Sequence, residues 1–298
     1  MSGLAQPVVR VAFVGLGAMG EPMAANLLKR GTSVTAVAHR RRDALERLEQ
    51  LGARAASTPQ DAGRDADIAV LMLPASSDVE SVIFGPSGLA SGMREGGLVI
   101  DCGTSDPECT RDVAARLHSQ GIAMVDAPVS RGVAGARDAS LCYFIGGCPE
   151  DIERARPVLA QMGNELHVMG SVGSGHAAKL LNNLVSLSTV VLVSEALALG
   201  RAAGLDDRTL LAALGAGSAS SSILASHGAR IAEGQHQPGF TIDLARKDLA
   251  LAMALASHRM VPSWVGAAAH QAYVAAAARG RGALDVAAVN ELPPAIPR

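Results

Sequence analysis

Residues 11–20, "VAFVGLGAMG", join an apolar run to three glycines in the order G-x-G-x-x-G. The first glycine permits a tight turn after a strand, the second lets the backbone approach a pyrophosphate, and the third allows close packing of a helix on the strand. N–H groups at the start of that helix attract an anion. The stretch therefore predicts a dinucleotide-binding loop, with a glycine-rich turn that holds no nucleotide as the structural alternative. The loop residues are Gly15, Gly17, Ala18, Met19 and Gly20.

Outward from this loop, short β-rich runs alternate with helix-like segments as far as residue 170. The expected strands are "VVRVAFVG" (8–15), "SVTAVA" (33–38), "DIAVLMLP" (67–74), "GLVIDCG" (97–103), "GIAMVDAPV" (121–129), "LCYFIGG" (141–147) and "ELHVMG" (165–170). Strands separated by helices of this length predict a mainly parallel, doubly wound sheet. After residue 170 the pattern is helical and begins with a long helix near Gly175. We therefore expect a Rossmann-type α/β domain over residues 1–170, an all-α domain over residues 171–298, and a long helix that joins them.

The composition excludes several classes of function. Lys and Arg (26) nearly balance Asp and Glu (28) among 298 residues, and aromatic residues make up only 2%. Neither a basic nucleic-acid-binding surface nor a set of base-stacking aromatics is expected. The four cysteines form no CxxC pair and no Cys/His spacing typical of zinc, so we expect no metal and no disulfides. The N-terminal stretch lacks the regions of a signal peptide, which favours the cytoplasm, with import into an organelle as the alternative.

The choice of dinucleotide depends on the end of the second expected strand. An NAD site usually has an acidic residue there for the ribose hydroxyls. This chain has a histidine and three arginines there instead (39–42), and an arginine can hold a 2′-phosphate through two hydrogen bonds. The sequence thus favours NADP(H), with NAD possible; a solvated charged face and a localisation signal are the alternatives. The residues assigned to this contact are His39, Arg40 and Arg41.

The long helix carries polar residues near its start, within "GSGHAAKLLNNLVSLSTVVLVSEALALG" (173–200). Residues three and four apart share a helix face, so Lys179 and Asn183 lie in one polar stripe with Asn182 and Ser186. The rest of this helix is apolar, which predicts burial and requires the stripe to face a polar cavity. A lysine that extends to solvent is the alternative. Glu195 interrupts the apolar run, so we expect no membrane span.

Five segments together resemble the β-hydroxyacid dehydrogenase family, which includes 3-hydroxyisobutyrate dehydrogenase and tartronate semialdehyde reductase. They are "FVGLGAMGEPMAANL" (13–27), "DCGTSDP" (101–107), "DAPVSRGVAGA" (126–136), "GSGHAAKLLNN" (173–183) and "GFTIDLARKDLALA" (239–252). They are spread along nearly the whole chain in the order and spacing of the family. The resemblance implies an enzyme that transfers a hydride between NADP(H) and a small 3-hydroxy acid or its semialdehyde.

The resemblance also implies roles for individual residues. Lys179 matches the general acid/base, which fits the chemistry, because carbonyl reduction needs a proton donor, and Asn183 matches a residue that holds the substrate. Ser130 and the backbone at Gly132 match the substrate-carboxylate site, and Phe240 matches an aromatic at the pocket edge. The remaining matches lie near the cofactor: Leu73, Pro74, Thr104, which also touches substrate, and Lys247. Asp248 is interpreted as structural.

One departure from the family pattern concerns the substrate. The family commonly has Ser-Gly-Gly where this chain has Ser130-Arg131-Gly132. Two alternatives are open for Arg131. Its side chain could add a cation to the carboxylate pocket, where it would bind a second acidic group or make two hydrogen bonds to one carboxylate, or it could turn outward. His176, in the first turn of the long helix, is either a proton relay or a helix-terminus residue.

Two other functions remain open at this point. The related imine reductases share the architecture, although they typically have another residue at the lysine position. A non-catalytic dinucleotide-binding module is the other alternative. A small substrate that carries a carboxylate is the expected partner, and the apolar helical domain and the resemblance favour a homodimer or homotetramer.

Overall fold

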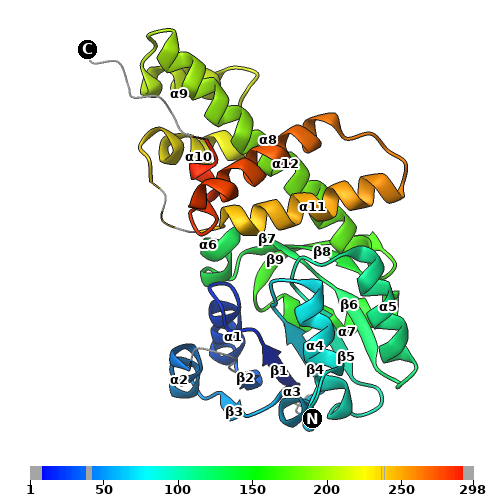
Figure 1. Ribbon diagram of the computed structural model, residues 1–298. Coiled ribbons are helices and arrows are strands. Elements are labelled where there is room, and N and C mark those ends of the chain that lie inside the picture. The colour runs from blue at the N-terminus through cyan, green and yellow to red at the C-terminus, as the bar shows by residue number, and fades with distance from the viewer. Residues whose placement is uncertain (1–8, 38–41, 236, 238, 291–298) are drawn as a thin grey trace, which may run out of the picture. The chain divides into compact units, whose positions relative to one another are not determined.

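The computed structural model describes residues 9–37, 42–235, 237 and 239–290, and the chain divides into two compact units, Met1–Lys179 and Leu180–Arg298. The first unit consists of a β-sheet with helices packed on it, and the second unit is helical (Figure 1). The predicted fold class is therefore confirmed. The division lies within helix α8 (Ser174–Ala202), somewhat later than the boundary at residue 170 that the sequence predicts.

The sheet of the first unit has the strand order of a doubly wound dinucleotide-binding domain. Within the described residues, its nine strands follow the order β3-β2-β1-β4-β5-β6-β8-β7, with β9 paired to β8. Pairing is parallel from β3 to β6 and between β8 and β9, and antiparallel where β8 meets β6 and β7. The strands are β1 (Arg10–Val14), β2 (Ser33–Val37), β3 (Arg54–Ala56), β4 (Ile68–Leu71), β5 (Leu98–Asp101), β6 (Ala123–Asp126), β7 (Val129–Ser130), β8 (Leu141–Gly146) and β9 (Gly163–Gly170).

Helices cover both faces of this sheet. Side chains alternate between the two faces of a strand, so Val11 and Phe13 of β1 pack with α1, α2 and α7, while Ala12 and Val14 pack with α3, α4 and α5. A buried side chain such as Phe13, which is 0% exposed, stabilises the fold by about 1.5–3 kcal/mol. The helices are α1 (Gly20–Lys29), α2 (Asp43–Gln50), α3 (Pro59–Gly63), α4 (Ser76–Phe84), α5 (Pro107–His118), α6 (Gly132–Arg137) and α7 (Pro149–Leu159).

The second unit contains most of α8 and the helices after it. Side-chain oxygens of Asp206, Ser221 and Thr241 accept hydrogen bonds from backbone N–H groups at the starts of α9, α10 and α11, which fixes where these helices begin. Tyr273 is fully buried in the core of this unit and donates to Leu187 O at 3.2 Å. The helices are α9 (Asp207–Ala216), α10 (Ser222–Ala232), α11 (Ile242–His258) and α12 (Trp264–Ala276).

Helix α8 is 29 residues long and carries the predicted polar stripe. Of the helices in the described chain, it alone is long and apolar enough to cross a membrane, with an 18-residue window of mean hydropathy 1.6. Half of that window is buried inside the protein, and core helices of soluble proteins meet the same criterion. The length and composition of α8 are therefore weak support for a membrane span.

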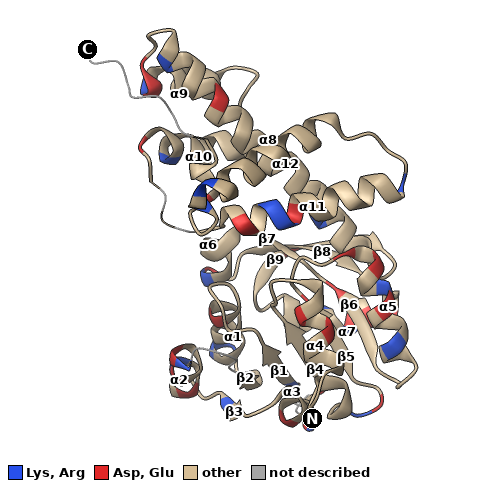
Figure 2. Cartoon of the chain, viewed as in Figure 1, with Lys and Arg blue, Asp and Glu red and all other residues tan. Residues whose placement is uncertain are grey.

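Charged residues of both signs are interspersed along the described chain (Figure 2). On α11, for example, the basic residues Arg246 and Lys247 stand between Asp243 and Asp248. This distribution of charged residues fits the near balance of Lys and Arg with Asp and Glu in the sequence.

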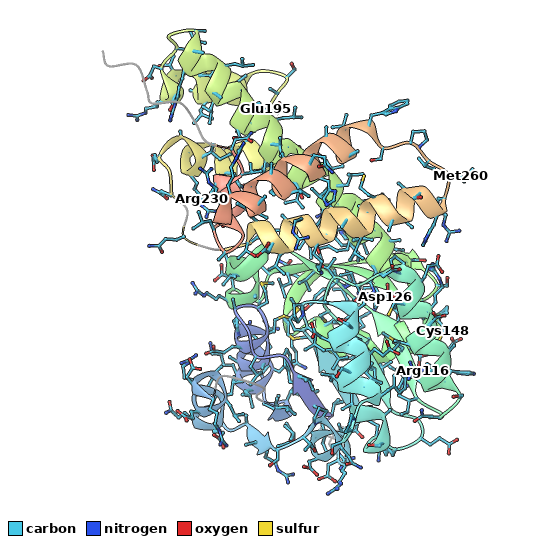
Figure 3. All side chains as sticks on the ribbon, viewed as in Figure 1. Arg116, Asp126, Cys148, Glu195, Arg230 and Met260 are labelled. Carbon is cyan, nitrogen blue, oxygen red and sulfur yellow. The ribbon has the colours of Figure 1, made fainter. Side chains whose placement is uncertain are left out.

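Figure 3 shows Met260 at the turn that follows α11, where it is 90% exposed.

Candidate active site

The glycine loop adopts the geometry that its sequence predicts. Gly15 follows β1 with φ of 103°, and a methyl group there would lie 2.2 Å from Met72 O. A methyl group on Gly20 would lie 1.8 Å from Gly15 O, so both positions require glycine. Gly17 differs, because nothing lies within 4 Å of the position of an added methyl group. Its glycine is therefore not explained by packing within the described protein, and it fits close approach of a ligand to the backbone.

The start of α1 completes a site for an anion. Met19 is the N-cap residue and makes no side-chain capping hydrogen bond, and the adjacent Ala18 is exposed. N–H groups at such a helix start favour a phosphate. Glu21 in the first turn would oppose an anion, but Arg47 of α2 donates to its two carboxylate oxygens at 2.6 and 2.8 Å. The loop and helix thus fit the pyrophosphate of a dinucleotide.

The predicted contact to a 2′-phosphate cannot be placed in the structure. His39, Arg40 and Arg41 lie outside the described residues. The choice between NADP and NAD therefore remains a prediction from the sequence.

Two further strand ends meet the glycine loop at the carboxyl edge of the sheet. Leu73, which is half-buried, and Pro74, which is exposed, follow β4, and a methyl group on Gly15 would lie 3.2 Å from Leu73 Cδ2. Thr104 follows β5 and is half-buried. The neighbouring Gly103 approaches so closely that a methyl group there would lie 2.7 Å from Leu73 O. The structure therefore brings the predicted residues after β1, β4 and β5 together, as expected for a ligand site in this fold.

The segment from Ser130 to Gly132 forms the turn from β7 into α6. Ser130 is half-buried, and Arg131 and Gly132 have φ of 82° and 60°. This left-handed region strains every residue except glycine by about 1–2 kcal/mol. The strain explains why glycine is common at the Arg131 position in the family pattern, and it shows that this chain keeps an arginine there at a cost.

The Arg131 side chain is engaged by other residues of the first unit. It donates to Ser140 O at 2.8 Å and to Asn164 Oδ1 at 2.9 Å, and it forms an ion pair with Glu165. The hydrogen bond from Arg131 holds the pKa of Glu165 below its ordinary value. A second acidic group on a substrate would therefore compete with Glu165 for this guanidinium.

Helix α1 is tied directly to the helix that follows the Ser130 segment. The side chain of Asn26 is 7% exposed and donates to Ala136 O of α6 at 2.7 Å. Because buried amide groups need hydrogen-bond partners, this hydrogen bond fixes α6 against α1. The polar Asn26 within the apolar stretch "MAANLL" was the signal for this contact, and the sequence analysis missed it.

The positive charges of Lys179 and Arg131 both influence the thiol of Cys142 within the first unit. Cys142 is half-buried on β8. Burial and the charge of Glu165 raise the pKa of its thiol, while the charges of Arg131 and Lys179 act in the opposite direction. The charges of the predicted general acid/base and of Arg131 therefore both favour the thiolate form of Cys142. Cys142 has no partner at a metal or disulfide spacing in the sequence, so this influence was not predicted.

Cys142, Glu165 and His167 are also close enough to be considered as metal ligands. One ligand atom of each lies within 4.8 Å of the others. Their types would suit zinc. We assign no metal to them, because Arg131 already holds the Glu165 carboxylate.

Further predicted residues form a cluster within the second unit. Asn183 follows Lys179 by one turn of α8, is 5% exposed, and donates to Asp248 Oδ2 at 2.6 Å. Asp248 Oδ1 lies 2.9 Å from Lys247 Nζ. Asp248 thus orients two residues that the family resemblance singles out, a role more specific than the structural one expected from the sequence. Phe240 is half-buried and packs against the core of this unit.

A cavity also lies elsewhere on the described part of the first unit. It has a volume of about 770 Å³ and is mostly apolar. Its walls include Arg111, Cys148, Ile152, Val168 and Val172, and none of the predicted site residues. We take the glycine loop and Lys179 as the site, because they carry the chemistry that this cavity lacks.

Comparison with known protein families agrees with the fold. Residues 10–170 match the NAD-binding domain of 6-phosphogluconate dehydrogenase, and residues 173–292 match the NAD-binding domain of NADP-dependent 3-hydroxyisobutyrate dehydrogenase. These two matches cover nearly all of the described chain.

Individual relatives are similar over almost their whole length. The 3-sulfolactaldehyde reductase of Escherichia coli is 37% identical over 94% of both chains. The 3-hydroxyisobutyrate dehydrogenase of Pseudomonas aeruginosa is 37% identical over 88% of this chain and 90% of its own. Among solved structures, Mycobacterium tuberculosis 3-hydroxyisobutyrate dehydrogenase with L-serine is 30% identical, has a TM-score of 0.86, and covers 95% of this chain and 98% of its own.

Imine reductases are more distant. The enzyme from Pseudomonas sp. has a TM-score of 0.63 at 18% identity, with 94% of this chain and 98% of its own covered, which shows a shared fold only. The glycine loop, the strand order and the full-length relatives lead to one conclusion. The chain belongs to the β-hydroxyacid dehydrogenase family and is an NAD(P)-dependent oxidoreductase.

Proposed function

We propose that this enzyme interconverts a small 3-hydroxy acid and its semialdehyde with NADP(H), and that Lys179 is the general acid/base. The observation that carries the proposal is that Lys179, a half-buried cation, lies in the same unit as a glycine loop that fits a dinucleotide. Reduction of a carbonyl requires both a proton donor and a hydride-carrying cofactor.

The residues of the glycine loop fit the cofactor that this reaction needs. The open space at Gly17 and the uncapped start of α1 favour the pyrophosphate, with Leu73, Pro74, Thr104 and Lys247 toward the nicotinamide. We propose that His39, Arg40 and Arg41 select the 2′-phosphate of NADP(H). When bound, the cofactor supplies or accepts the hydride.

Lys179 would move the proton that the reaction requires. In the reductive direction, its ammonium donates a proton to the carbonyl oxygen while carbon receives the hydride, which yields a hydroxyl group and a neutral amine. The amine regains its proton from solvent. In the oxidative direction, the amine removes the hydroxyl proton. Helix α8 holds this side chain half-buried, where water competes less for the transfer.

The remaining predicted residues would hold the substrate. Ser130 and the backbone at Gly132 offer O–H and N–H donors for a carboxylate, with Phe240 at the pocket edge. Asn183 is held by Asp248, and its amide would hold the substrate as the family resemblance implies. Arg131 would favour a substrate with a second acidic group if that group replaces Glu165 at the guanidinium.

A substrate panel tests the reaction class and the choice of cofactor. NADPH and NADH consumption is measured with succinic semialdehyde, tartronate semialdehyde, methylmalonate semialdehyde, glyoxylate and 3-sulfolactaldehyde. We expect turnover of at least one of these with NADPH preferred. Turnover of a cyclic imine but of no aldehyde or keto acid would refute the proposed reaction, and NADPH binding with no turnover of any compound would indicate a binding module.

We also propose that the enzyme acts in the cytoplasm as a homodimer or homotetramer. One face of α8 exposes large apolar side chains, including Leu181 at 54%, Val185 at 67% and Leu192 at 55%. Such a stripe favours a protein contact. Sedimentation equilibrium checks this, and a monomer at micromolar concentration would contradict it.

A further inference from the structure

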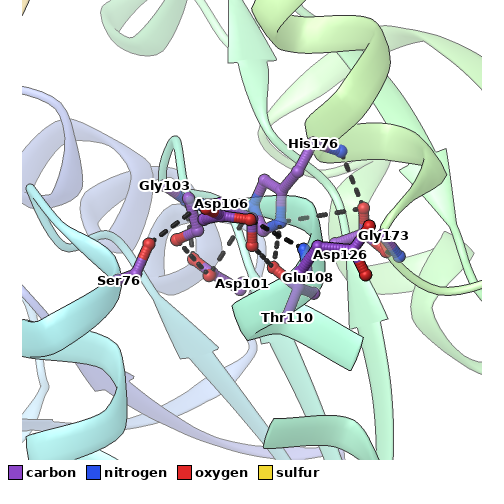
Figure 4. A network of polar contacts seen from close by, with 10 residues as sticks. Ser76, Asp101, Gly103, Asp106, Glu108, Thr110, Asp126, Gly173 and His176 are labelled. Carbon is purple, nitrogen blue, oxygen red and sulfur yellow. Dashed lines mark hydrogen bonds and ion pairs between the residues drawn. The ribbon is translucent and has the colours of Figure 1, made fainter. Parts of the chain in front are cut away.

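A buried polar cluster in the first unit has no role in the reaction proposed above. At its centre lies His176, in the first turn of α8, with 0% of its surface exposed. Two buried carboxylates, Asp101 and Asp126, lie on either side of its ring, and Thr110 of α5 contacts it (Figure 4). Burying this many polar groups is costly unless they bind one another in defined positions.

Asp126 fixes the beginning of α8. It lies at the end of β6, and its carboxylate accepts hydrogen bonds from the N–H groups of Gly173 and His176, each at 2.7 Å. A carboxylate that accepts from the first N–H groups of a helix stabilises the helix start. Burial raises the pKa of Asp126, while the nearby His176 and these N–H donors act in the opposite direction. Lys179 follows His176 by three residues on the same face of the helix.

The His176 ring joins this helix start to α5 and β5. Its Nδ1 lies 2.8 Å from Thr110 Oγ1, and Thr110 uses its hydroxyl proton to donate to Asp106 O at 2.9 Å. Both contacts join the Thr110 hydroxyl, one to the ring and one to the backbone at the start of α5. The other ring nitrogen, Nε2, faces Asp101 Oδ2 at 3.6 Å. The ring thus has a fixed orientation between three elements.

Asp101 in turn fixes the turn that carries Thr104. Its Oδ1 accepts from Gly103 N at 2.8 Å, and its Oδ2 accepts from Ser105 Oγ at 3.1 Å. Thr104 lies between these two anchored residues. Asp101 therefore stabilises the turn that carries Thr104, and Asp126 stabilises the start of α8. The His176 ring lies between these two carboxylates.

We infer that His176 is a positioning residue that holds the Thr104 turn and the start of α8 in fixed register, so that Lys179 meets the reacting carbonyl. The inference rests on the proposed function of Lys179. The His176 ring does not touch the substrate in this account; it acts through Asp101, Asp126 and Thr110. Its loss would affect the chemical step more than the binding of NADPH.

Four variants test this inference. His176→Phe keeps a ring but removes both nitrogens, and His176→Asn restores an amide near the position of Nδ1. Thr110→Val has nearly the same shape as threonine and removes only the hydroxyl contact. Val158→Ala is the matched control, because Val158 is 1% exposed in the core of the same unit on α7 and its apolar side chain forms none of the hydrogen bonds or ion pairs described above.

Four readouts are compared: kcat and KM with the best substrate, the Kd for NADPH, the melting temperature, and hydrogen exchange of the amides at residues 176–180. We expect His176→Phe to lower kcat on the order of 10- to 100-fold, as a misplacement of about 1 Å does. NADPH affinity should stay near wild type, exchange at 176–180 should accelerate, and His176→Asn should recover most of kcat. Thr110→Val should lower kcat about 2- to 10-fold, the effect of one hydrogen bond.

A purely structural role gives a different pattern. If His176→Phe and Val158→Ala lose thermal stability alike while kcat of the folded enzyme stays at wild type, or if His176→Asn is no better than His176→Phe, the inference is wrong. If His176→Phe does not fold, Thr110→Val decides, and unchanged kcat and exchange in it overturn the inference. Should the proposed function fail, so that no turnover depends on Lys179, the exchange result still shows whether His176 holds the start of α8.

Discussion

Substitution of Gly17 by alanine separates ligand binding from folding in the glycine loop. Nothing in the described protein lies within 4 Å of the added methyl group, and Gly17 does not have a positive φ. The variant should therefore fold, with a change in unfolding free energy of at most about 1 kcal/mol. The methyl group would occupy space next to the α1 start, where the account places the pyrophosphate.

The loss of cofactor affinity follows from the contacts that the methyl group disturbs. Displacing the pyrophosphate weakens one or two hydrogen bonds to a charged group, each worth about 1.5–3 kcal/mol. If one such hydrogen bond is lost, we expect the Kd for NADPH to rise on the order of 10- to 100-fold, since 1.4 kcal/mol of binding free energy is a factor of ten in Kd.

The assay is a fluorescence titration of NADPH beside a thermal melt, with Gly20→Ala as the contrasting variant. A methyl group on Gly20 would meet Gly15 O at 1.8 Å, so that variant should lose stability as well as binding. If Gly17→Ala binds NADPH like the wild type, the pyrophosphate does not lie against this loop, and the reasoning is refuted.

Two further predictions concern specificity and stability. Arg131→Gly relieves a positive φ and removes an exposed ion pair with Glu165, so the unfolding free energy should change by at most about 1 kcal/mol. Its KM should rise about tenfold for a substrate with a second acidic group, the effect of one charge-assisted contact, and stay unchanged for a monocarboxylate; equal effects would remove Arg131 from substrate selection. Asp285 is 1% exposed; burial raises the pKa of its carboxyl, but N–H groups and Arg230 at 3.0 Å outweigh burial and leave this pKa below its ordinary value. Asp285→Asn should cost about 2–4 kcal/mol at pH 7 by chemical denaturation. Because the folded pKa is depressed, this contribution is present above about pH 3.9, the unfolded value, and is lost as the pH falls through the folded value; a difference that does not narrow in acid contradicts the assignment.

Local sequence patterns predicted the fold well. The alternation of apolar runs and helices located the strands of the sheet apart from β3 and β7. The three residues of β3, Arg54–Ala56, are too short and too exposed to give a pattern, and the two residues of β7 follow β6 so closely that they were not predicted as a separate strand. Gly15 and Gly20 are required by contacts a few residues away or at the end of a neighbouring strand, which the known glycine motif already encodes. Periodicity and turn residues are local properties, so they can be recognised without knowing the tertiary contacts.

Partners that are distant in the sequence could not be predicted. Asn183 is held by Asp248, which is 65 positions away, and Arg131 is held by Glu165, which is 34 positions away. For His176 the sequence left a proton relay and a helix-terminus residue as alternatives, because its environment is created by three other elements of the first unit. Charge and polarity of a residue are visible in the sequence, but the group that neutralises it depends on the tertiary fold.

The central claim is that Lys179 transfers the proton, and it is tested by steady-state kinetics of Lys179→Ala with NADPH and the best substrate. Lys29→Ala serves as the matched control, because Lys29 is exposed in the last turn of α1. We predict that kcat of Lys179→Ala falls by about 10²- to 10⁴-fold, the usual worth of general acid catalysis, while the Kd for NADPH and the melting temperature stay near wild type. A Lys179→Ala enzyme that turns over as fast as Lys29→Ala would contradict the proposed mechanism.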